Sequence, residues 1–259
     1  MIRRSGNYKK QYMIAWLIAR RNQLKVIHRK EKTMANVGCR IYSNIKRAPK
    51  ELIEGFRGIP VANIDDCMGR IACCGSDLMP MNKAPLLGTA FTVKAPEGDN
   101  LMFHKALEMA QPGDILVIAA GGSKHRSLCG EIMSMTAMAA GLGGFVVDGC
   151  IRDKDEIGEF TDFSVYATGV TPNGPYKNGP GEINVPVSVC GQVICPGDIL
   201  IGDGDGLLVI KPEEAEELLK KARAVVAMED QQKADIRSGK GLQKPWLGEK
   251  LKELGCEFF

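Results

Sequence analysis

A stretch of alternating strand-like and helix-like segments between residues 115 and 157 restricts the fold of this chain more than any other feature. Apolar runs at 115–120 (ILVIAA) and 144–148 (GFVVD) predict strands, and the Ala- and Met-rich segment 130–140 between them predicts a helix. Two strands joined through a helix pair in parallel by a right-handed crossover. The stretch therefore predicts a βαβ unit at the centre of an α/β fold.

The rest of the chain continues the same alternation. Further strands are expected at 86–94, 164–167, 185–189 and 207–210, and further helices at 49–56, 61–71, 100–110, 153–159 and 212–235. Alternation of this kind is typical of α/β proteins with parallel strand pairs. The motif PGDI occurs twice before an apolar run, and we interpret its aspartates, Asp114 and Asp198, as turn-capping residues. The segment GDGDG at 202–206 is expected to be a turn between strands.

The charge of the chain is divided unevenly. Residues 1–33 contain ten Lys and Arg but one acidic residue, Glu31, so the net charge of +3 leaves residues 34–259 at −6. Because proteins neutralise phosphates with clustered Lys and Arg, this acidic body argues against a nucleic-acid-binding surface. The apolar stretch 12–19 (YMIAWLIA) is shorter than the roughly 20 apolar residues that cross a bilayer, so no membrane association is expected.

These observations divide the chain into two parts. Residues 1–33 are expected to be a basic N-terminal extension outside the fold, with a targeting peptide as the alternative interpretation. Residues 34–259 are expected to form one globular domain. Nine cysteines without CxxC spacing and three scattered histidines favour reduced thiols in a cytoplasmic protein over disulfides or a zinc site.

Glycine-rich segments follow both strands of the βαβ unit. We expect loops at 121–130 (GGSKHRSLCG) and 149–153 (GCIRD), which converge outside the carboxyl ends of parallel strands, where ligands collect. The first loop ends at Gly130, where the helix is expected to begin. The first backbone N–H groups of this helix lack intrahelical partners and are suited to a substrate carboxylate; they belong to Glu131, Ile132 and Met133.

The second loop carries two charged side chains that complement this helix end. Arg152 offers a planar guanidinium that can hold a carboxylate through two hydrogen bonds. Asp153 is a hard oxygen ligand suited to Mg²⁺ or Mn²⁺, ions that take one or two carboxylates and keep several waters, which Glu131 and Glu156 are placed to orient. Each residue alone also fits a surface charge pair or a helix cap. Their convergence indicates a site.

The spacing of these residues is specific as well. The pattern GG(x)7GE(x)20RDxxE, formed by Gly121–Gly122, Gly130–Glu131, Arg152–Asp153 and Glu156, resembles the signature of the RraA-like family. Similar segments extend over about 34–235, most of the chain. The family includes 4-hydroxy-4-methyl-2-oxoglutarate/4-carboxy-4-hydroxy-2-oxoadipate aldolases and oxaloacetate decarboxylases. Where its aldolases often carry Asp, this chain has Glu131.

The resemblance implies an RraA-like aldolase domain over residues 34–259, a compact α/β sandwich assembled as a homotrimer or hexamer. It implies that residues 130–133 and Arg152 bind the pyruvate part of a small 2-oxo acid and that Asp153 holds Mg²⁺ or Mn²⁺. Arg152 is expected to stabilise the charge that develops during the reaction, and Glu131, through a water, to act as the base. The expected activity is cleavage of 4-hydroxy-2-oxo acids and oxaloacetate to pyruvate.

Two alternatives stay open at this point. Lys124, in the first loop, is the candidate for a Schiff-base aldolase, although a solvated loop residue is the simpler interpretation. Family members that regulate a ribonuclease act by contact rather than catalysis, so a non-catalytic binding protein is the other alternative. The presence of Arg152, Asp153 and Glu156 together favours an enzyme.

Overall fold

The computed structural model describes residues 36–241 and 244–257, so the predicted basic extension at 1–33 lies outside the described residues. At its centre, four parallel strands follow one another in the sheet in chain order. They are β3 (Leu86–Lys94), β4 (Asp114–Ser127), β5 (Gly144–Ile151) and β6 (Ser164–Val170). The predicted βαβ unit and the α/β fold class are confirmed, because β4 and β5 pair in parallel and α5 (Glu131–Ala139) connects them.

Shorter strands complete the sheet at its two edges. Next to β3 lie β7 (Gly181–Ile183) and then β1 (Cys39–Ile41), and β2 (Met79–Pro80) lies next to β6. A hairpin of β10 (Ile199–Asp203) and β11 (Gly206–Ile210) pairs antiparallel with β3 through β10. The predicted turn at 202–206 is the tip of this hairpin. A separate small sheet contains β8 (Val187–Val189) and β9 (Gln192–Ile194).

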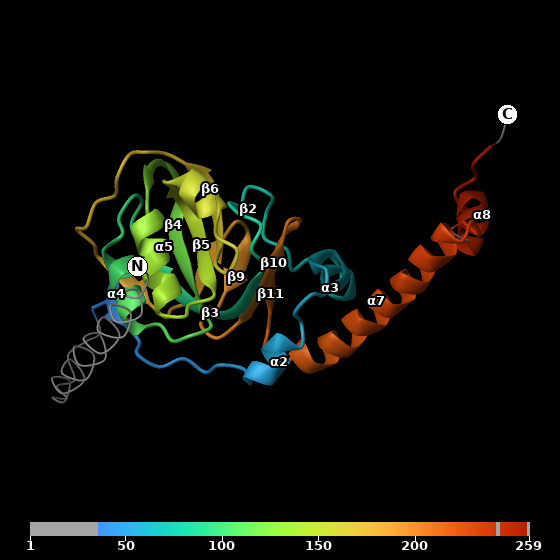
Figure 1. Cartoon of the computed structure of the whole chain (residues 1–259), viewed down its shortest axis with the longest axis horizontal. Coiled ribbons are helices and arrows are strands. Elements are labelled where there is room, and N and C mark those ends of the chain that lie inside the picture. The colour runs from blue at the N-terminus through green and yellow to red at the C-terminus, as the bar shows by residue number, and fades with distance from the viewer. Residues whose placement is uncertain (1–35, 242–243, 258–259) are drawn as a thin grey trace, which may run out of the picture. The chain divides into compact units, whose positions relative to one another are not determined.

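One group of helices covers a face of the central sheet, and another group packs on the hairpin of β10 and β11 (Figure 1). α4 (Leu101–Met109), α5 and α6 (Lys154–Gly158) contribute to one core, in which the rings of Phe103, Phe145 and Phe163 meet edge to face with centroids 4.9 Å apart. A second core contains side chains from α2 (Lys50–Glu54), α3 (Val61–Cys67) and the first turns of α7 (Ala215–Arg237) packed on β10 and β11. The last helix is α8 (Pro245–Glu253). Within the described ranges, no helix combines the length and apolar character needed to cross a membrane.

The two loops predicted at the ends of β4 and β5 are largely strand. β4 continues to Ser127 and β5 to Ile151, with pairing of Ser123 to Gly149 and of Ser127 to Cys150. The sheet shifts register between Ala119 and Ser123, where Gly121 and Gly122 have φ of 71° and 68°. Two glycines accept this left-handed backbone without a Cβ clash, so they form a bulge, after which the polar segment resumes pairing.

Both PGDI turns cap their own backbone, as predicted, and also form ion pairs. Asp114 Oδ2 accepts the Gln111 N–H at 2.8 Å, and the Asp114 carboxylate forms two hydrogen bonds with Arg47 at 2.8 and 2.7 Å. Asp198 Oδ2 likewise accepts the Cys195 N–H and the Lys211 ammonium. The sequence could not predict these cations, because they lie 67 and 13 residues away along the chain.

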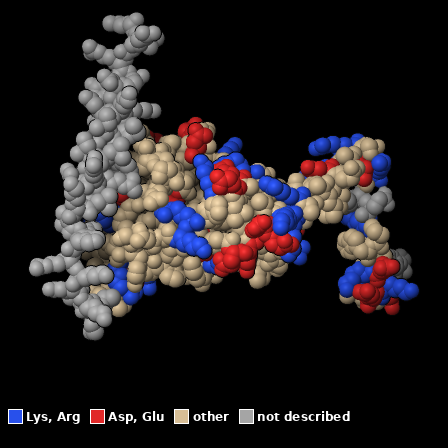
Figure 2. Space-filling view, turned by 90° about the horizontal axis from the view of Figure 1, so that it is seen from below, with Lys and Arg blue, Asp and Glu red and all other residues tan. Residues whose placement is uncertain are grey.

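All nine cysteines are free thiols, in agreement with the sequence analysis. On the face shown in Figure 2, Lys and Arg are interspersed with Asp and Glu rather than gathered into one large basic area. The absence of a nucleic-acid partner stays a prediction.

Candidate active site

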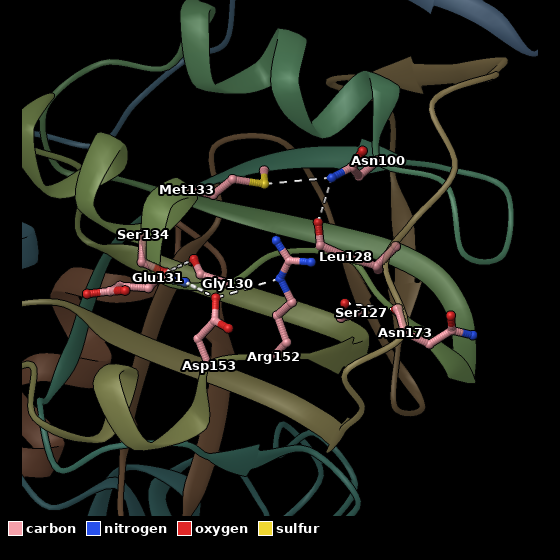
Figure 3. Close-up of polar contacts among 10 residues, drawn as sticks. All are labelled: Asn100, Ser127, Leu128, Gly130, Glu131, Met133, Ser134, Arg152, Asp153 and Asn173. Atoms are coloured by element: carbon pink, nitrogen blue, oxygen red, sulfur yellow. Dashed lines mark hydrogen bonds and ion pairs between the residues drawn. The ribbon is translucent and has the colours of Figure 1, made fainter.

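The candidate site lies where β4 and β5 end side by side. The backbone N–H of Leu128 donates to the Cys150 carbonyl at 2.8 Å, and the N–H of Arg152 donates to the Cys129 carbonyl at 3.0 Å. These two bonds continue the pairing of the strands beyond their ends. They place Arg152 and Asp153 beside Gly130, the residue before α5 (Figure 3).

Gly130 permits the closest approach in this site. A Cβ on Gly130 would lie 2.2 Å from Asp153 Oδ2 and 2.9 Å from Arg152 Cγ, distances that real Cβ atoms essentially never show. Its backbone is extended, with φ −155° and ψ −161°, so its conformation does not require glycine. The missing side chain is therefore what lets the two charged residues pack against the start of α5.

Asp153 interacts directly with that helix start. Its Oδ2 accepts the backbone N–H of Glu131 at 3.0 Å and lies 3.6 Å from Nε of Arg152. Asp153 itself has φ of 56°, a left-handed conformation that Asp and Asn tolerate better than most residues. One of the N–H groups predicted to bind substrate is thus satisfied by Asp153, while the Ile132 and Met133 N–H groups remain in the first turn, where a helix offers no internal partner.

The two predicted glutamates lie apart from the charged pair. The Glu131 side chain extends to the opposite side of Gly130 from Arg152 (Figure 3). Glu156 is exposed on α6. In the described part of the chain, neither carboxylate forms a polar contact with Arg152 or Asp153, so their expected role as water-holding groups stays a prediction.

Asp153 is the residue that fits a divalent cation. Within residues 36–241 and 244–257, no cluster of three or more His, Cys, Asp or Glu side chains is placed to hold a metal. A single carboxylate is nevertheless sufficient for Mg²⁺, which commonly takes one or two carboxylates and keeps its waters. Asp153 Oδ2 is oriented by the Glu131 N–H, and the side chain is 37% exposed, so a hydrated ion can reach the second oxygen.

Asn100 is a neighbour of the site that the sequence analysis missed. Its Nδ2 donates to the Leu128 carbonyl at 2.8 Å and contacts Met133 Sδ at 3.7 Å, which connects the start of α4 to both sides of Gly130 (Figure 3). Asn100 is 2% exposed, and its Oδ1 has no hydrogen-bond partner among the described residues. In a sequence, an Asn just before an apolar helix is interpreted as a helix cap, so its contact with Leu128 could not be predicted.

Asp148 is a second residue that the sequence analysis did not consider. It lies on β5, on the same face as Val146, whose side chain packs with β8 and β9, and is 9% exposed. Burial raises the pKa of Asp148, while hydrogen bonds from the Gly122 N–H and the Cys190 thiol act against that shift. The Cys190 Sγ lies 3.9 Å from Asp148 Oδ1. The Gly122 N–H, at the glycine bulge, thus holds the carboxylate of Asp148.

Lys124 lies on the extended part of β4 and is exposed. Its ammonium donates to the Thr168 carbonyl at 3.1 Å on the neighbouring strand. The described contacts therefore place it against β6 rather than beside Arg152 and Asp153.

Comparisons with known proteins show which family the chain is similar to. The family model described as RraA-like, Aldolase/RraA, matches residues 61–209. A Halalkalibacterium halodurans protein named "Putative 4-hydroxy-4-methyl-2-oxoglutarate aldolase" is 38% identical over 69% of this chain and 85% of its own. The 4-hydroxy-4-methyl-2-oxoglutarate aldolase of Thermus thermophilus is 35% identical over 49% of this chain and 77% of its own. The solved structure of Streptomyces coelicolor RraAS2, described as an unusual member of the RNase ES inhibitor RraA family, has a TM-score of 0.65 at 26% identity and covers 72% of this chain and 98% of that one.

Proposed function

This chain belongs to the RraA-like family, and from that premise we propose that it is a divalent-metal-dependent carbon–carbon lyase. Its substrates are 4-hydroxy-2-oxo acids of the 4-hydroxy-4-methyl-2-oxoglutarate type and oxaloacetate, and pyruvate is a product of both reactions. The observation that carries the proposal is the packing of Arg152 and Asp153 against Gly130 at the start of α5. The names of its relatives supply the substrate class.

Arg152 is the residue that binds the substrate carboxylate. Its side chain is 47% exposed, and its Nε lies at 3.6 Å from Asp153 Oδ2, longer than a hydrogen bond, so its donors are available to a ligand. A guanidinium binds a carboxylate through two parallel hydrogen bonds. The first-turn N–H groups of Ile132 and Met133 add the positive end of the α5 dipole on the same side.

Asp153 would hold the metal ion through the carboxylate oxygen that the Glu131 N–H leaves open. A bound Mg²⁺ or Mn²⁺ supplies Lewis acidity toward the carbonyl oxygen of a 2-oxo acid. Glu156, three residues further along the chain, remains the candidate for orienting water around such an ion.

Cleavage of a 4-hydroxy-2-oxo acid breaks the bond between C3 and C4. The C4 hydroxyl loses its proton and becomes a carbonyl, and the electron pair of the broken bond remains on the pyruvate fragment as an enolate, which takes up a proton at C3. Arg152 stabilises this negative charge. Glu131, through a water, is the candidate for accepting the hydroxyl proton. Oxaloacetate gives the same enolate when its C4 carboxylate leaves as CO₂.

A direct assay tests the proposal. Purified protein is treated with EDTA and then supplied with oxaloacetate or 4-hydroxy-4-methyl-2-oxoglutarate, with and without Mg²⁺ or Mn²⁺, and pyruvate is measured. We expect pyruvate formation above the rate of the same mixture without protein only with the ion present. Full activity after chelation would overturn the metal requirement, and borohydride trapping of a pyruvate adduct would then point to Lys124. Pyruvate formation that never exceeds the rate without protein would overturn the lyase proposal.

The second candidate function is that of a ribonuclease regulator. The similarity to the Streptomyces structure supports it. The same preparation distinguishes the two candidates, because a regulator slows a ribonuclease in stoichiometric amounts without forming pyruvate. An enzyme forms pyruvate in many turnovers per chain.

We also propose that the protein assembles as a homotrimer or hexamer. Ile132 and Met135 on α5 are 76% and 55% exposed, beside the candidate site. They lie three residues apart on one face of the helix, so they adjoin, and contiguous exposed apolar surface marks sites that another protein covers. Light scattering after size-exclusion chromatography measures the assembly, and a monomer would contradict this proposal.

A further inference from the structure

One segment borders the guanidinium of Arg152 from the side away from Asp153. It comprises residues 171–179 (TPNGPYKNG), between β6 and β7, and we refer to it as the strap. Gly174 is the strap residue that faces Arg152, because a Cβ built on Gly174 would lie 3.7 Å from Arg152 Nη1 and would contact nothing else within 4 Å. The guanidinium therefore has Asp153 at its Nε end and Gly174 at its Nη1 end.

The strap is tied to β4 on one side of Gly174. The Asn173 carbonyl accepts the Ser127 N–H at 2.8 Å and the Ser127 hydroxyl at 3.0 Å. The Asn173 side chain donates to the His125 carbonyl at 2.9 Å. The residue before Gly174 therefore has three hydrogen bonds to a strand of the central sheet.

Arg126 fixes Gly174 itself and the residues that follow. Its Nη1 donates to the Gly174 carbonyl at 2.7 Å, its Nη2 donates to the Tyr176 hydroxyl at 2.6 Å, and its guanidinium lies 3.8 Å from the Tyr176 ring centroid. The Tyr176 backbone is tied further to Gly98 and Asn100 at 2.8 and 3.0 Å. Because Asn173, the Gly174 carbonyl and Tyr176 are all held by these bonds, Gly174 keeps its position beside Arg152.

We propose that Gly174 determines the size of the substrate, by leaving room beside Arg152 for the methyl branch at C4 of the 2-oxo acid. The inference rests on the proposed function. Because the strap is held in place, one methyl group added to it would strongly weaken binding of the transition state. Gly174 has an ordinary backbone conformation, so alanine adds the methyl group without backbone strain.

The test compares two substrates that differ by that one methyl group, 4-hydroxy-4-methyl-2-oxoglutarate and 4-hydroxy-2-oxoglutarate. For Gly174→Ala, we expect kcat/KM for the methylated acid to fall at least about tenfold relative to the unmethylated acid, the scale for one methylene in a rigid pocket. Gly174→Val should exceed that ratio. The control is Gly204→Ala, in the hairpin turn, where an added Cβ meets nothing within 4 Å.

A second variant tests whether the rigidity of the strap matters, independently of folding defects at residue 174. Arg126→Ala removes the bonds to Gly174 and Tyr176. In the double variant Arg126→Ala/Gly174→Ala, the ratio of kcat/KM for the two acids should therefore return toward the ratio measured for Arg126→Ala alone. If Gly174→Ala leaves the ratio of the two kcat/KM values unchanged, whether both fall equally or neither falls, the inference is overturned and the lyase proposal stays intact. Wild-type protein that cleaves neither acid would overturn both.

Discussion

The carboxylate of Asp153 accepts a hydrogen bond from the backbone N–H of Glu131 at 3.0 Å. This contact joins the end of β5 to the start of α5, and it lets one side chain cap a helix while its other oxygen stays available to a cation. The two roles respond differently to substitution. A variant that keeps an acceptor but loses the negative charge separates them.

Asp153→Asn is that variant. The amide oxygen can still accept the Glu131 N–H, and Asn tolerates the left-handed backbone at this position. We expect Mg²⁺-supported pyruvate formation to be abolished while the free energy of unfolding changes by less than about 1 kcal/mol, the usual contribution of a helix cap. Turnover and thermal melting measure the two effects. Asp153→Ala should lose turnover too, but with a lower melting temperature. Normal turnover in Asp153→Asn would show that the charge is not needed.

Gly130→Ala should disturb Arg152 and Asp153 together, because the new Cβ would overlap Asp153 Oδ2 and crowd Arg152 Cγ. We expect kcat/KM for oxaloacetate to fall at least about a hundredfold, the scale for a displacement of about 1 Å in a catalytic site. Steady-state kinetics measure this loss. Gly158→Ala, in α6, is the matched control, since its Cβ would meet nothing within 4 Å. Wild-type kinetics in Gly130→Ala would mean that the packing of this pair does not matter to the reaction.

Arg152→Lys keeps the positive charge but replaces the two-pronged guanidinium with a single ammonium. Binding of pyruvate, measured by calorimetry, should weaken by about 1–3 kcal/mol, on the scale of charge-assisted hydrogen bonds. Because Arg152 is half exposed, the melting temperature should stay close to wild type. Unchanged affinity for pyruvate would place the carboxylate elsewhere.

Asp148 should make stability depend on pH in the unusual direction for a carboxylate. Burial raises its pKa above the ordinary 3.8, so the folded protein binds the proton more tightly than the unfolded chain. The contribution is fully present below about pH 3.8 and is lost as pH rises through the folded pKa. Asp148→Asn removes this loss and keeps an acceptor for the Gly122 N–H.

We therefore expect Asp148→Asn to melt at a higher temperature than wild type at pH 7, with the difference shrinking toward pH 4. Melting curves across this range measure the effect, with Asp162→Asn, at an exposed position, as the control. A variant that is less stable than wild type at pH 7 would contradict the prediction.

The sequence predicted the elements whose residues form long, regular patterns. The strand at 86–94 was predicted with its observed bounds, and the four helices at 61–71, 100–110, 130–140 and 212–235 were each placed within a few residues. The ends of β4 and β5 were wrong, because polar residues such as Lys124 and His125 resemble a loop when their partner strand is unknown. The short strands β1, β2, β7 and β9 were not predicted, since two or three residues carry no periodicity, and the helix α8 was not predicted either.

For the candidate site, the sequence by itself determined the family, the βαβ unit and the identity of Gly130, Arg152 and Asp153, because spacing along two adjacent strands fixes which residues follow their ends. Only the tertiary structure decided what surrounds them. Asn100, Ser127 and Gly174 reach the site through contacts that span tens of residues, such as the bond from Asn100 to Leu128. Such contacts depend on how separate elements pack, and no local pattern of residue types encodes them. The same holds for the Glu131 N–H, which the sequence assigned to substrate and the fold directs to Asp153.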